Sequence, residues 1–454
     1  MKVFYISTYA NPKIKNGNTT SSTLASKLIE LNIDVNIVTC SADPTWHESL
    51  SGEVFNLDGF DVLKTSANGI PIISVGVPDA WYQHTLDEST WEHAVSWGIL
   101  FFRKFNPNIV HLQQWQNLWW LLEAAQRLNI PTVYSVNDYG MTCQRIVLID
   151  GEGNPCNGEV SIKKCSKCVF KGRSIAGKIN EIVVALPGGQ PILEFISRAH
   201  KFSNITSRSV NLPVKRRVEL RIERSRSILS KLSACIVGSP FGAEVMIKNG
   251  LRENAIEISP WFHTEKDDKL PITVEPTKLI LGFIGRISPE KGLHILLDAV
   301  SRIDQQHELH LKIAGEVSGH YAKQLYERYK KKVGHATIEW LGWLSPDERA
   351  DFYLGIHMLV VPSLCLETGP LSLVEALAFK KPVLCTDVPP MKWLIDTFQG
   401  GIVFPFADTE KLMKVLQQLI DGDLKLTELS RKIINPPNLE TYSKRVVDAY
   451  HAIS

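Results

Sequence analysis

Two glutamates and two basic residues in the second half of this chain have types and spacings that could bind a charged ligand. In the segment LETGPLSLVEALA, Glu367 opens a Gly-Pro loop, and Glu375 follows eight positions later on the helix that this loop starts. Arg286 and Lys291 lie upstream in IGRISPEKG, on an expected strand-to-helix turn. Cationic turns and helix N-termini suit a diphosphate, because both offer positive potential and directed donors. Carboxylates accept hydrogen bonds from sugar and ribose hydroxyls, so together these residues favour a nucleotide-sugar pocket.

At these residues the chain resembles the retaining glycosyltransferases of the GT-B fold, the large glycosyltransferase family 4. GRISPEKG is similar to the family's donor-phosphate turn, and PSLCLETGPLSLVEALAFKKPVLCTD is similar to its segment of two spaced glutamates with the strand that follows. The resemblance implies that Arg286 and Lys291 neutralise the donor's diphosphate. It also implies that Glu367 accepts hydrogen bonds from the donor sugar beside the reaction centre, and that Glu375 binds the ribose hydroxyls.

The loop between the two glutamates is expected to bring backbone N–H groups close to the phosphates. Gly369, Pro370 and Leu371 form this loop. Pro370 has no N–H to donate, so Gly369, Leu371 and Ser372 must supply the donors.

The first half of the chain resembles the family less closely, and by resemblance it receives the acceptor. Relatives usually have a pair of glycines in the first loop, where this chain has only Gly17, in NGN. Gly17 either forms an acceptor-side loop or simply makes a turn.

His111 in NIVHLQQWQ matches the first histidine of the family's strand-end signature, whereas Gln113 replaces the second. His111 is either an acceptor-side residue or a buried histidine satisfied by its surroundings.

The segment YSVNDYGMTC matters most for the mechanism. Many relatives have His-Asp where this chain has Asn137-Asp138. Asn137 can still donate amide hydrogens near the reaction centre, but it cannot become cationic or shuttle a proton. Asp138 either positions the acceptor or caps a local turn.

Four cysteines follow in a C-x12-C-x8-C-x2-C spacing: Cys143, Cys156, Cys165 and Cys168. Some relatives have a similar cysteine-bearing insertion after their His-Asp segment. Four thiols this close together suit a structural tetrahedral zinc site, although there is only one C-x-x-C pair. Isolated reduced thiols are an equal alternative, and an iron–sulfur cluster or redox switch is a third. Nearby Trp115, Trp119 and Trp120 are expected to pack in the core rather than to stack on a sugar.

The arrangement of apolar runs predicts two α/β domains. Apolar strands such as KVFYIST, DVNIVTC, LILGFIG and MLVVPS alternate with helical stretches, which implies right-handed crossovers and parallel sheets. We expect an N-terminal domain over 1–258, a C-terminal donor domain over 259–436, and a last helix over 437–454 that crosses back to the first domain. No G-x-G-x-x-G motif occurs in either half, which argues against a nicotinamide enzyme.

One basic segment stands out in a chain whose formal net charge is only +2. About 163–231 there are 16 lysines and arginines against 4 glutamates. The segment is either a set of solvated helix faces or a surface for anionic lipid or a polyprenyl-diphosphate acceptor. Nucleic acid is disfavoured, since aromatic residues do not alternate with these charges. The sequence shows neither a run of ~20 apolar residues nor a signal-peptide pattern, and it predicts a cytoplasmic protein that associates peripherally with the inner face of the membrane.

The resemblance therefore implies a GT-B fold, with two Rossmann-like doubly wound parallel-sheet domains facing each other across a cleft. It implies transfer of a glycosyl unit, with retention, from a nucleotide diphosphate sugar to a glycan or lipid-linked acceptor in cell-surface polysaccharide or glycolipid synthesis. No cofactor or catalytic metal is expected for that reaction. The alternatives are a nucleotide-sugar 2-epimerase of the same architecture and a catalytically impaired nucleotide-sugar-binding protein.

Overall fold

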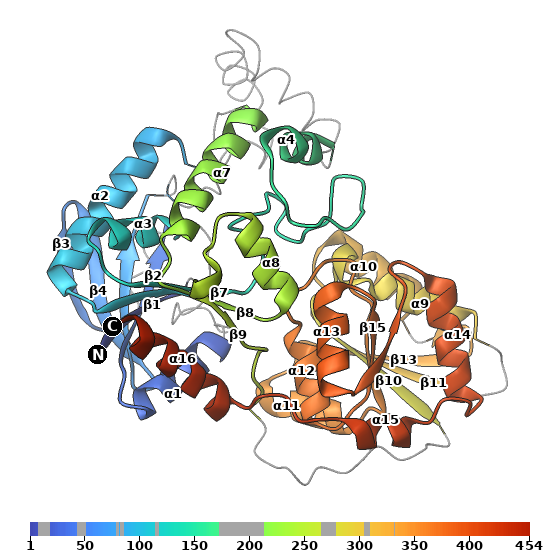
Figure 1. The fold of residues 1–454 in the computed structure, drawn as a ribbon. Helices are drawn as coiled ribbons and strands as arrows, with labels where there is room; N and C mark the ends of the chain where they lie inside the picture. Colours follow the sequence, from blue (N-terminus) through green and yellow to red (C-terminus); the bar gives the residue numbers. More distant parts are fainter. Residues whose placement is uncertain are drawn as a thin grey trace. The chain divides into compact units, whose positions relative to one another are not determined.

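The structure is a computed structural model of the 454-residue chain. It describes residues 1–7, 19–42, 51–78, 81, 86–113, 118–171, 213–264, 278–303, 309–330 and 332–454. The chain divides into two compact units (Figure 1). The first unit comprises Met1–Val237, Gly242–Ile258 and Ser443–Ser454, and the second comprises Gly238–Phe241 and Ser259–Tyr442.

The first unit is built on a nine-stranded sheet with the order β3-β4-β5-β2-β1-β6-β7-β8-β9. Its strands are β1 (Lys2–Ile6), β2 (Asp34–Ser41), β3 (Glu53–Leu57), β4 (Phe60–Ala67), β5 (Ile70–Gly76), β6 (Ile109–Leu112), β7 (Thr132–Val136), β8 (Ala234–Val237) and β9 (Ile256–Ile258). From β5 through β2 and β1 to β9 every neighbouring pair is parallel. The short central strands β6, β7 and β8 are buried at every position, as expected for parallel strands covered on both faces.

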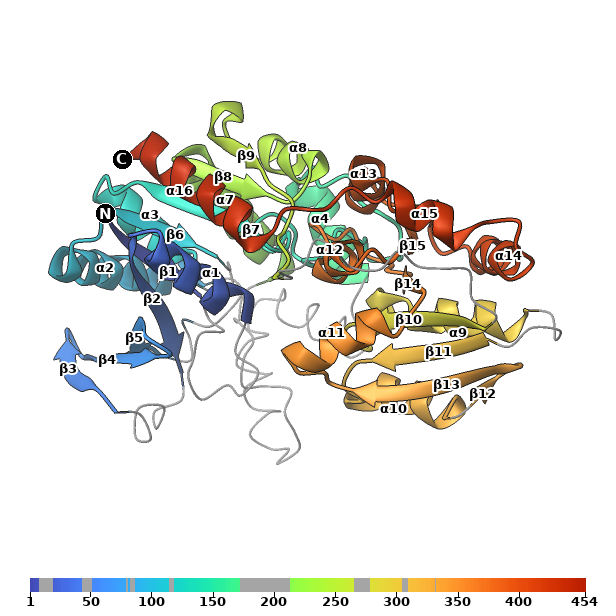
Figure 2. The same ribbon diagram turned by 90° about the horizontal axis from the view of Figure 1, so that it is seen from below.

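An antiparallel ribbon of β3, β4 and β5 extends this sheet at one edge (Figure 2). Two-residue turns connect its strands, Asp58-Gly59 and Asn68-Gly69, and all four of these residues have positive φ. Such turns match the right-handed twist of a hairpin. The first sheet is therefore mixed rather than purely parallel as the alternation of strands and helices had suggested.

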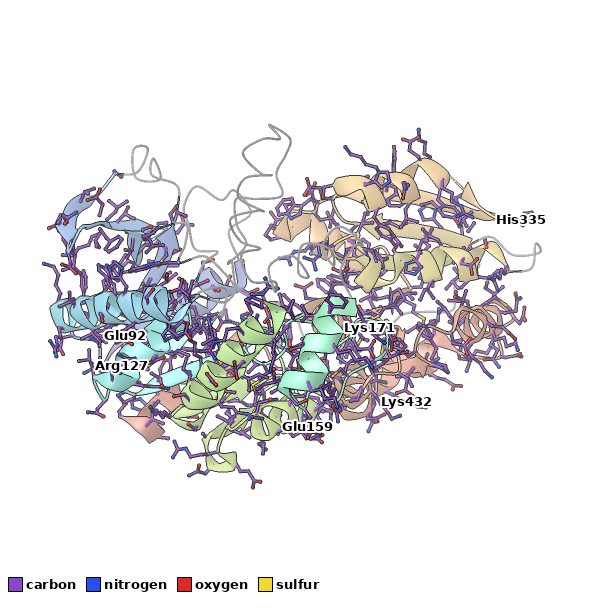
Figure 3. The ribbon with its side chains drawn as sticks, turned by 90° about the horizontal axis from the view of Figure 1, so that it is seen from above. Glu92, Arg127, Glu159, Lys171, His335 and Lys432 are labelled. Carbon is purple, nitrogen blue, oxygen red and sulfur yellow. The ribbon has the colours of Figure 1, made fainter. Side chains whose placement is uncertain are left out.

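The helices of the first unit connect and cover these strands. They are α1 (Thr19–Glu30), α2 (Glu88–Phe105), α3 (Trp120–Arg127), α4 (Ile162–Lys171), α7 (Val214–Ser230), α8 (Pro240–Lys248) and, in its C-terminal part, α16 (Leu439–Ile453). Arg127 of α3 binds both carboxylate oxygens of Glu92 on α2, at 2.5 and 2.8 Å (Figure 3). Trp119 and Trp120 are 2% and 1% exposed, so core packing is confirmed for both, whereas Trp115 lies outside the described residues.

The second unit is built on a seven-stranded sheet with the order β12-β13-β11-β10-β14-β15-β16. Its strands are β10 (Leu279–Ile284), β11 (Leu309–Ala314), β12 (Lys332–Val333), β13 (Ala336–Gly342), β14 (Met358–Val361), β15 (Val383–Thr386) and β16 (Gly401–Phe404). All pairs are parallel except β12 with β13. Setting β12 aside, the order is that of a doubly wound Rossmann-like sheet, whose strand order reverses between β10 and β14.

Helices cover both faces of this second sheet. They are α9 (Leu293–Ser301), α10 (Gly319–Arg328), α11 (Pro346–Leu354), α12 (Leu371–Ala378), α13 (Pro389–Phe398), α14 (Thr409–Ile420) and α15 (Leu426–Lys432). Alternate residues of β10 enter two different cores: Leu281 and Phe283 pack with α9 and α14, whereas Ile280 and Ile284 pack against the cluster around α12 and α13. Within the described ranges of both units, no helix is long and apolar enough to cross a bilayer.

Candidate functional site

The turn after β10 positions Lys291. A 3-10 turn, Pro289–Lys291, ends at Gly292, which has a φ of 70° and precedes α9. A Cβ on Gly292 would lie 1.8 Å from the carbonyl oxygen of Pro362, the residue that follows β14. The N–H of Leu364 also donates to the carbonyl of Glu290 at 2.7 Å. The turns after β10 and β14 are therefore packed directly on each other, at the point where the strand order reverses.

This packing joins Lys291 to Glu367. Lys291 Nζ lies 2.5 Å from Glu367 Oε1, and Ser363 Oγ donates to the same oxygen at 2.9 Å. The Cys365 thiol points to Oε1 as well, at 3.6 Å. Glu367 Oε2 takes part in none of these three contacts. The two charged side chains are mostly buried, at 26% exposed for Lys291 and 16% for Glu367.

The pair keeps both residues charged. Burial alone would raise the pKa of Glu367, but the Lys291 charge and the hydrogen bonds from Lys291 and Ser363 outweigh it and lower the pKa. Burial would likewise lower the pKa of Lys291, and the Glu367 carboxylate reverses this and raises it. A charged ammonium and a charged carboxylate thus lie together beside the switch point of the second sheet, the place between β10 and β14 where the strand order reverses.

Arg286 belongs to the same turn but is much more accessible. Its side chain is 70% exposed and pairs with Glu290 within the turn, at 2.9 Å. An exposed arginine can reorient toward an anion at little cost, because a surface ion pair contributes only ~0–1 kcal/mol.

Glu375 lies on α12 and is held from α11. Arg349 Nη1 is 3.1 Å from Glu375 Oε1, and the Tyr353 hydroxyl donates to Oε2 at 2.7 Å. The start of α11 is fixed by a capping box in which the Ser345 hydroxyl and the Glu348 carboxylate bond each other's backbone N–H. Burial, together with the Glu375 charge, holds the pKa of Tyr353 well above its usual value. Glu375 is therefore an acceptor that two side chains of α11 hold in place, and it remains 18% exposed.

The loop before α12 leaves the start of that helix open. Gly369 has a φ of 145°, and Pro370 is the N-cap residue. Among the described residues, no side chain caps this helix. The N–H groups of Leu373 and Val374 donate to the Pro370 carbonyl at 3.1 and 3.4 Å. The predicted donors Leu371 and Ser372 precede these two, in the first turn, where N–H groups point out of a helix.

His111, predicted on the acceptor side, is enclosed in the first unit. It lies in β6 with no exposed surface. Its Nδ1 is 2.6 Å from the Tyr450 hydroxyl on α16, and its Nε2 is 2.8 Å from Ser135 Oγ on β7. Burial lowers the pKa of His111 to about 3. The neutral ring connects α16 to the sheet, which agrees with the interpretation of His111 as a buried histidine satisfied by its surroundings. An acceptor-side role for His111 remains a prediction.

Asn137 and Asp138 follow β7. The Asn137 amide donates to the carbonyl of Gln113, which follows β6. Asp138 Oδ1 accepts from the N–H of Gly140 at 2.7 Å. This hydrogen bond caps a local turn, which is one of the two roles that the sequence suggested for Asp138. The structure thus brings Asn137 and Gln113 together at the ends of adjacent strands. Gly17 lies outside the described residues.

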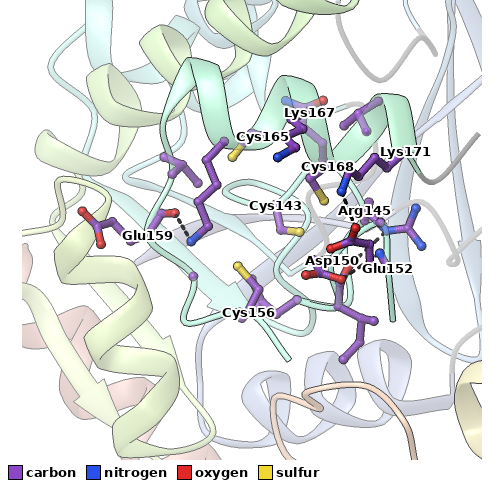
Figure 4. A pocket seen from close by; sticks show the side chains of 18 residues that line it. Cys143, Arg145, Asp150, Glu152, Cys156, Glu159, Cys165, Lys167, Cys168 and Lys171 are labelled. Atoms are coloured by element: carbon purple, nitrogen blue, oxygen red, sulfur yellow. Dashed lines mark hydrogen bonds and ion pairs between the residues drawn. The ribbon is translucent and has the colours of Figure 1, made fainter. Parts of the chain in front are cut away.

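The four cysteines of the insertion line one pocket (Figure 4). In the part of the chain that the structure describes, no three histidine, cysteine, aspartate or glutamate side chains form a ready-made metal site.

In the described parts of the basic segment, 163–171 and 213–231, several of the basic side chains are buried or paired. Arg221 and Arg224 of α7 are only 2% and 8% exposed, and Arg224 donates to the carbonyl of Leu86 at 2.6 Å and lies over the ring of Trp91. Arg216 pairs with two glutamates. These three arginines therefore serve to hold α7 in the first unit rather than to form an open charged surface. Residues 172–212 of the segment lie outside the described residues.

Four residues of the site were missed in the sequence: Ser363, Cys365, Arg349 and Tyr353. The first two lie within four positions of Glu367 and follow a buried strand, a position that could have pointed to them. Arg349 and Tyr353 come from a helix more than twenty positions before Glu375, and no local pattern links them to it.

Two families match this chain. Residues 17–156 match the family described as Glycosyl transferase 4-like domain, and residues 265–435 match Glycosyl transferases group 1. An uncharacterised glycosyltransferase of Methanocaldococcus jannaschii is 32% identical over 146 residues, which cover 32% of this chain and 39% of the relative. The chain thus spans about two fifths of that relative's length.

Solved structures match over the whole chain. Sucrose-phosphate synthase from Thermosynechococcus elongatus aligns with a TM-score of 0.62 at 16% identity, covering 99% of this chain and 98% of that one. The Anabaena protein HepE, in complex with UDP-glucose, aligns with a TM-score of 0.56 at 13% identity, covering 100% and 98%. At sequence identities of 16% and 13%, the similarity to these structures shows a shared fold and no more.

The two family matches together take in more than half of the chain, in the expected order. This chain belongs to the family 4, group 1 glycosyltransferases. The expected fold class, two α/β units of GT-B type, is confirmed.

Proposed function

We propose that this protein is a retaining glycosyltransferase that uses a nucleotide diphosphate sugar. The observation that carries the proposal is the Lys291–Glu367 pair, which the turns after β10 and β14 hold at the switch point of the second sheet. Ligands of doubly wound sheets bind at this point, outside the carboxyl ends of the strands. A cation and a carboxylate in contact there suit a ligand that has a phosphate next to hydroxyl groups.

Each part of a nucleotide sugar has a partner in this unit. Lys291 and Arg286, with the N–H groups that begin α12, take the diphosphate, since all of them offer positive potential. Glu367 Oε2 accepts from a donor sugar hydroxyl while Oε1 stays with Ser363. Glu375 accepts from the ribose hydroxyls, held in place by Arg349 and Tyr353. The UDP-glucose complex of HepE supports this class of donor.

The proposed reaction is a front-side substitution at the anomeric carbon. The bond from that carbon to the diphosphate oxygen breaks, and a bond to the acceptor oxygen forms on the same face, which retains the configuration. The acceptor's proton passes to the departing phosphate oxygen. Lys291 stabilises the negative charge that develops on this leaving group, which is the kind of interaction that lowers a barrier most. Asn137 contributes an amide donor but no titrating group, and no step calls for a cofactor.

The acceptor we propose is a lipid-linked or surface-polysaccharide precursor at the inner face of the membrane. The support is the charge of α4, where Lys163, Lys164 and Lys167 are exposed. Basic side chains near an anionic bilayer contribute ~1 kcal/mol each to binding. Association of this kind is reversible and peripheral.

The test is a donor panel followed by product analysis. UDP-, GDP-, ADP- and dTDP-sugars are compared by thermal shift, where a ligand at 100 times its Kd stabilises the fold by ~2.7 kcal/mol. The best donor is then incubated with and without lipid-linked acceptors, and the anomer of the product is assigned by NMR. Retained configuration in an acceptor-dependent product supports the proposal. An epimerised sugar formed without acceptor points to the 2-epimerase, and binding without any turnover points to an impaired binding protein.

A further inference from the structure

Four thiols from three stretches of the first unit surround one cavity of about 220 Å³. Figure 4 shows the sulfur atoms of all four cysteines gathered around it. Cys143 and Cys156 come from the irregular chain that follows β7, and Cys165 and Cys168 come from one face of α4. The two pairs therefore face each other across the cavity from separate segments.

The backbone holds the first pair in a fixed loop. The N–H of Cys156 donates to the carbonyl of Leu148 at 2.8 Å, and Ile149 bridges to Pro155. Ile146 and Leu148 have positive φ values of 73° and 51°. A branched or bulky residue in this region costs ~1–3 kcal/mol and persists only where other interactions fix the chain. The loop between Cys143 and Cys156 therefore contains strained residues. Its two ends carry the two thiols of this pair.

Backbone N–H groups point at two of the four thiols: those of Arg145 and Leu148 at Cys143, and that of Gly151 at Cys168. Four basic side chains line the cavity: Arg145, Lys164, Lys167 and Lys171. N–H donors and nearby cations are what stabilise sulfur ligands that carry negative charge.

Within the described residues, few apolar side chains hold this region together. No residue of α4 is buried in the structure, which describes this helix in full. The apolar cluster beneath it consists of Val160, Val214, Val218 and Ile222, with Ile162, Cys165 and Val169 packed at its margin. Four buried aliphatic side chains give a small core, and small units of this kind usually need a disulfide or a metal.

We propose that Cys143, Cys156, Cys165 and Cys168 bind one structural zinc ion in this cavity. Zinc takes four thiolates in a closed tetrahedral site and contributes its binding energy to folding. In the described residues the side chains do not stand as a ready-made site, so metal binding requires the four thiols to come closer together. Each thiol releases its proton to solvent as its sulfur–zinc bond forms. The resulting site carries a net charge of minus two. Four basic side chains line the cavity against the carboxylates of Asp150, Glu152 and Glu159, so the lining offsets part of that charge.

The experiment is metal analysis of the purified full-length chain after expression with added zinc. Elemental analysis is expected to find about one equivalent of zinc, and substitution with Co²⁺ is expected to give the absorption bands of a tetrahedral thiolate site. Cys165→Ala and Cys143→Ala are each expected to lower the zinc content at least tenfold. Cys40→Ala, which removes a buried thiol of β2, is the matched control and is expected to retain the metal.

The wild-type protein also gives a readout that does not depend on the variants folding. Removal of zinc by a thiol-reactive mercurial and a chelator is expected to make the segment around α4 sensitive to protease and to lower Tm, and added zinc is expected to reverse both. Wild-type protein without metal, in which all eight cysteines react as thiols after unfolding in denaturant, overturns the proposal in favour of isolated thiols. Four missing thiols without metal indicate disulfides. Iron with inorganic sulfide indicates a cluster, and either result also overturns it.

Discussion

Lys291 Nζ and Glu367 Oε1 lie 2.5 Å apart, although 76 positions separate the two residues in the sequence. The contact exists because β10 and β14 are neighbours in the sheet and each ends in a turn that packs on the other. A glycine at 292 permits this packing, since any side chain there would meet the Pro362 carbonyl. Each of the two residues belongs to a short motif that follows its own strand. The fold brings these two motifs together and so forms a charged pair at the switch point.

Replacing Lys291 by alanine is expected to lower kcat/KM by roughly 30- to 1000-fold without unfolding the protein. Losing one charged contact to the leaving group costs ~2–4 kcal/mol of transition-state stabilisation. Lys392→Ala, on the exposed face of α13, is the control and should leave activity unchanged.

A double variant separates the role in catalysis from the role in pairing. Lys291→Ala leaves the mostly buried Glu367 without its ammonium partner, and Glu367→Gln removes that charge. If Lys291 only neutralised Glu367, the double variant would be as active as Glu367→Gln alone. We expect it to recover Tm and to be less active than that single variant.

Tyr353→Phe is expected to weaken binding of the nucleotide diphosphate roughly 3- to 10-fold. The change removes the 2.7 Å hydrogen bond that fixes Glu375 and leaves the ring in place, and such a bond is worth ~0.5–1.5 kcal/mol. The measurement is calorimetric titration with the ribonucleotide and its 2′,3′-dideoxy analogue. If Glu375 binds the ribose, the loss will be much smaller with the dideoxy analogue; equal losses would place the ribose elsewhere.

Gly292→Ala is expected to destabilise the second unit by about 3 kcal/mol or more, as severe steric changes in packed positions do. The added Cβ would lie 1.8 Å from a carbonyl oxygen, in backbone with a φ of 70°. Gly319 has nearly the same φ, 75°, and open space around its Cβ position. Gly319→Ala therefore reports the conformational cost alone, and denaturant unfolding of both variants measures the difference. Similar losses would mean that the turns after β10 and β14 can separate freely.

Parts of the structure that depend on neighbouring residues could be predicted from the sequence, whereas contacts between distant segments could not. The donor turn and the spaced glutamates are short, local patterns on strand-to-helix turns, and parallel strands bring such turns to one edge. The antiparallel ribbon was not predicted from the sequence, although its Asp-Gly and Asn-Gly turns are strong hairpin signals, because strands alternate with helices in the rest of the chain. The contact of His111 with Tyr450 spans 339 positions. Only tertiary packing determines a contact of that kind, so no spacing in the sequence predicts it.

His111 is expected to make the first unit less stable as the pH falls below about 6.5. Its pKa is about 3 in the folded protein and about 6.5 when exposed. Between these values the unfolded chain binds the additional proton, so folding loses up to ~1.4 kcal/mol per pH unit from this group. Urea unfolding of wild type and His111→Gln across this range should show a shallower pH dependence in the variant. His93→Gln, at an exposed position of α2, should keep the wild-type slope, and equal slopes in all three proteins would contradict the buried, neutral state.

Binding to anionic liposomes is expected at low salt and should disappear as salt rises. Exposed charges act over a Debye length of ~10 Å at 0.1 M salt, and each contributes ~1 kcal/mol near the bilayer. The double variant Lys163→Gln/Lys167→Gln on α4 should therefore lose on the order of 30-fold in partitioning, because ~1.4 kcal/mol is a factor of ten. Lys411→Gln/Lys414→Gln changes two exposed lysines of α14 in the second unit and should bind like wild type. Absence of flotation at low salt, or the same loss in both variants, would point to an acceptor in solution, because the charge of α4 would then have no particular part in bringing the protein to its substrate.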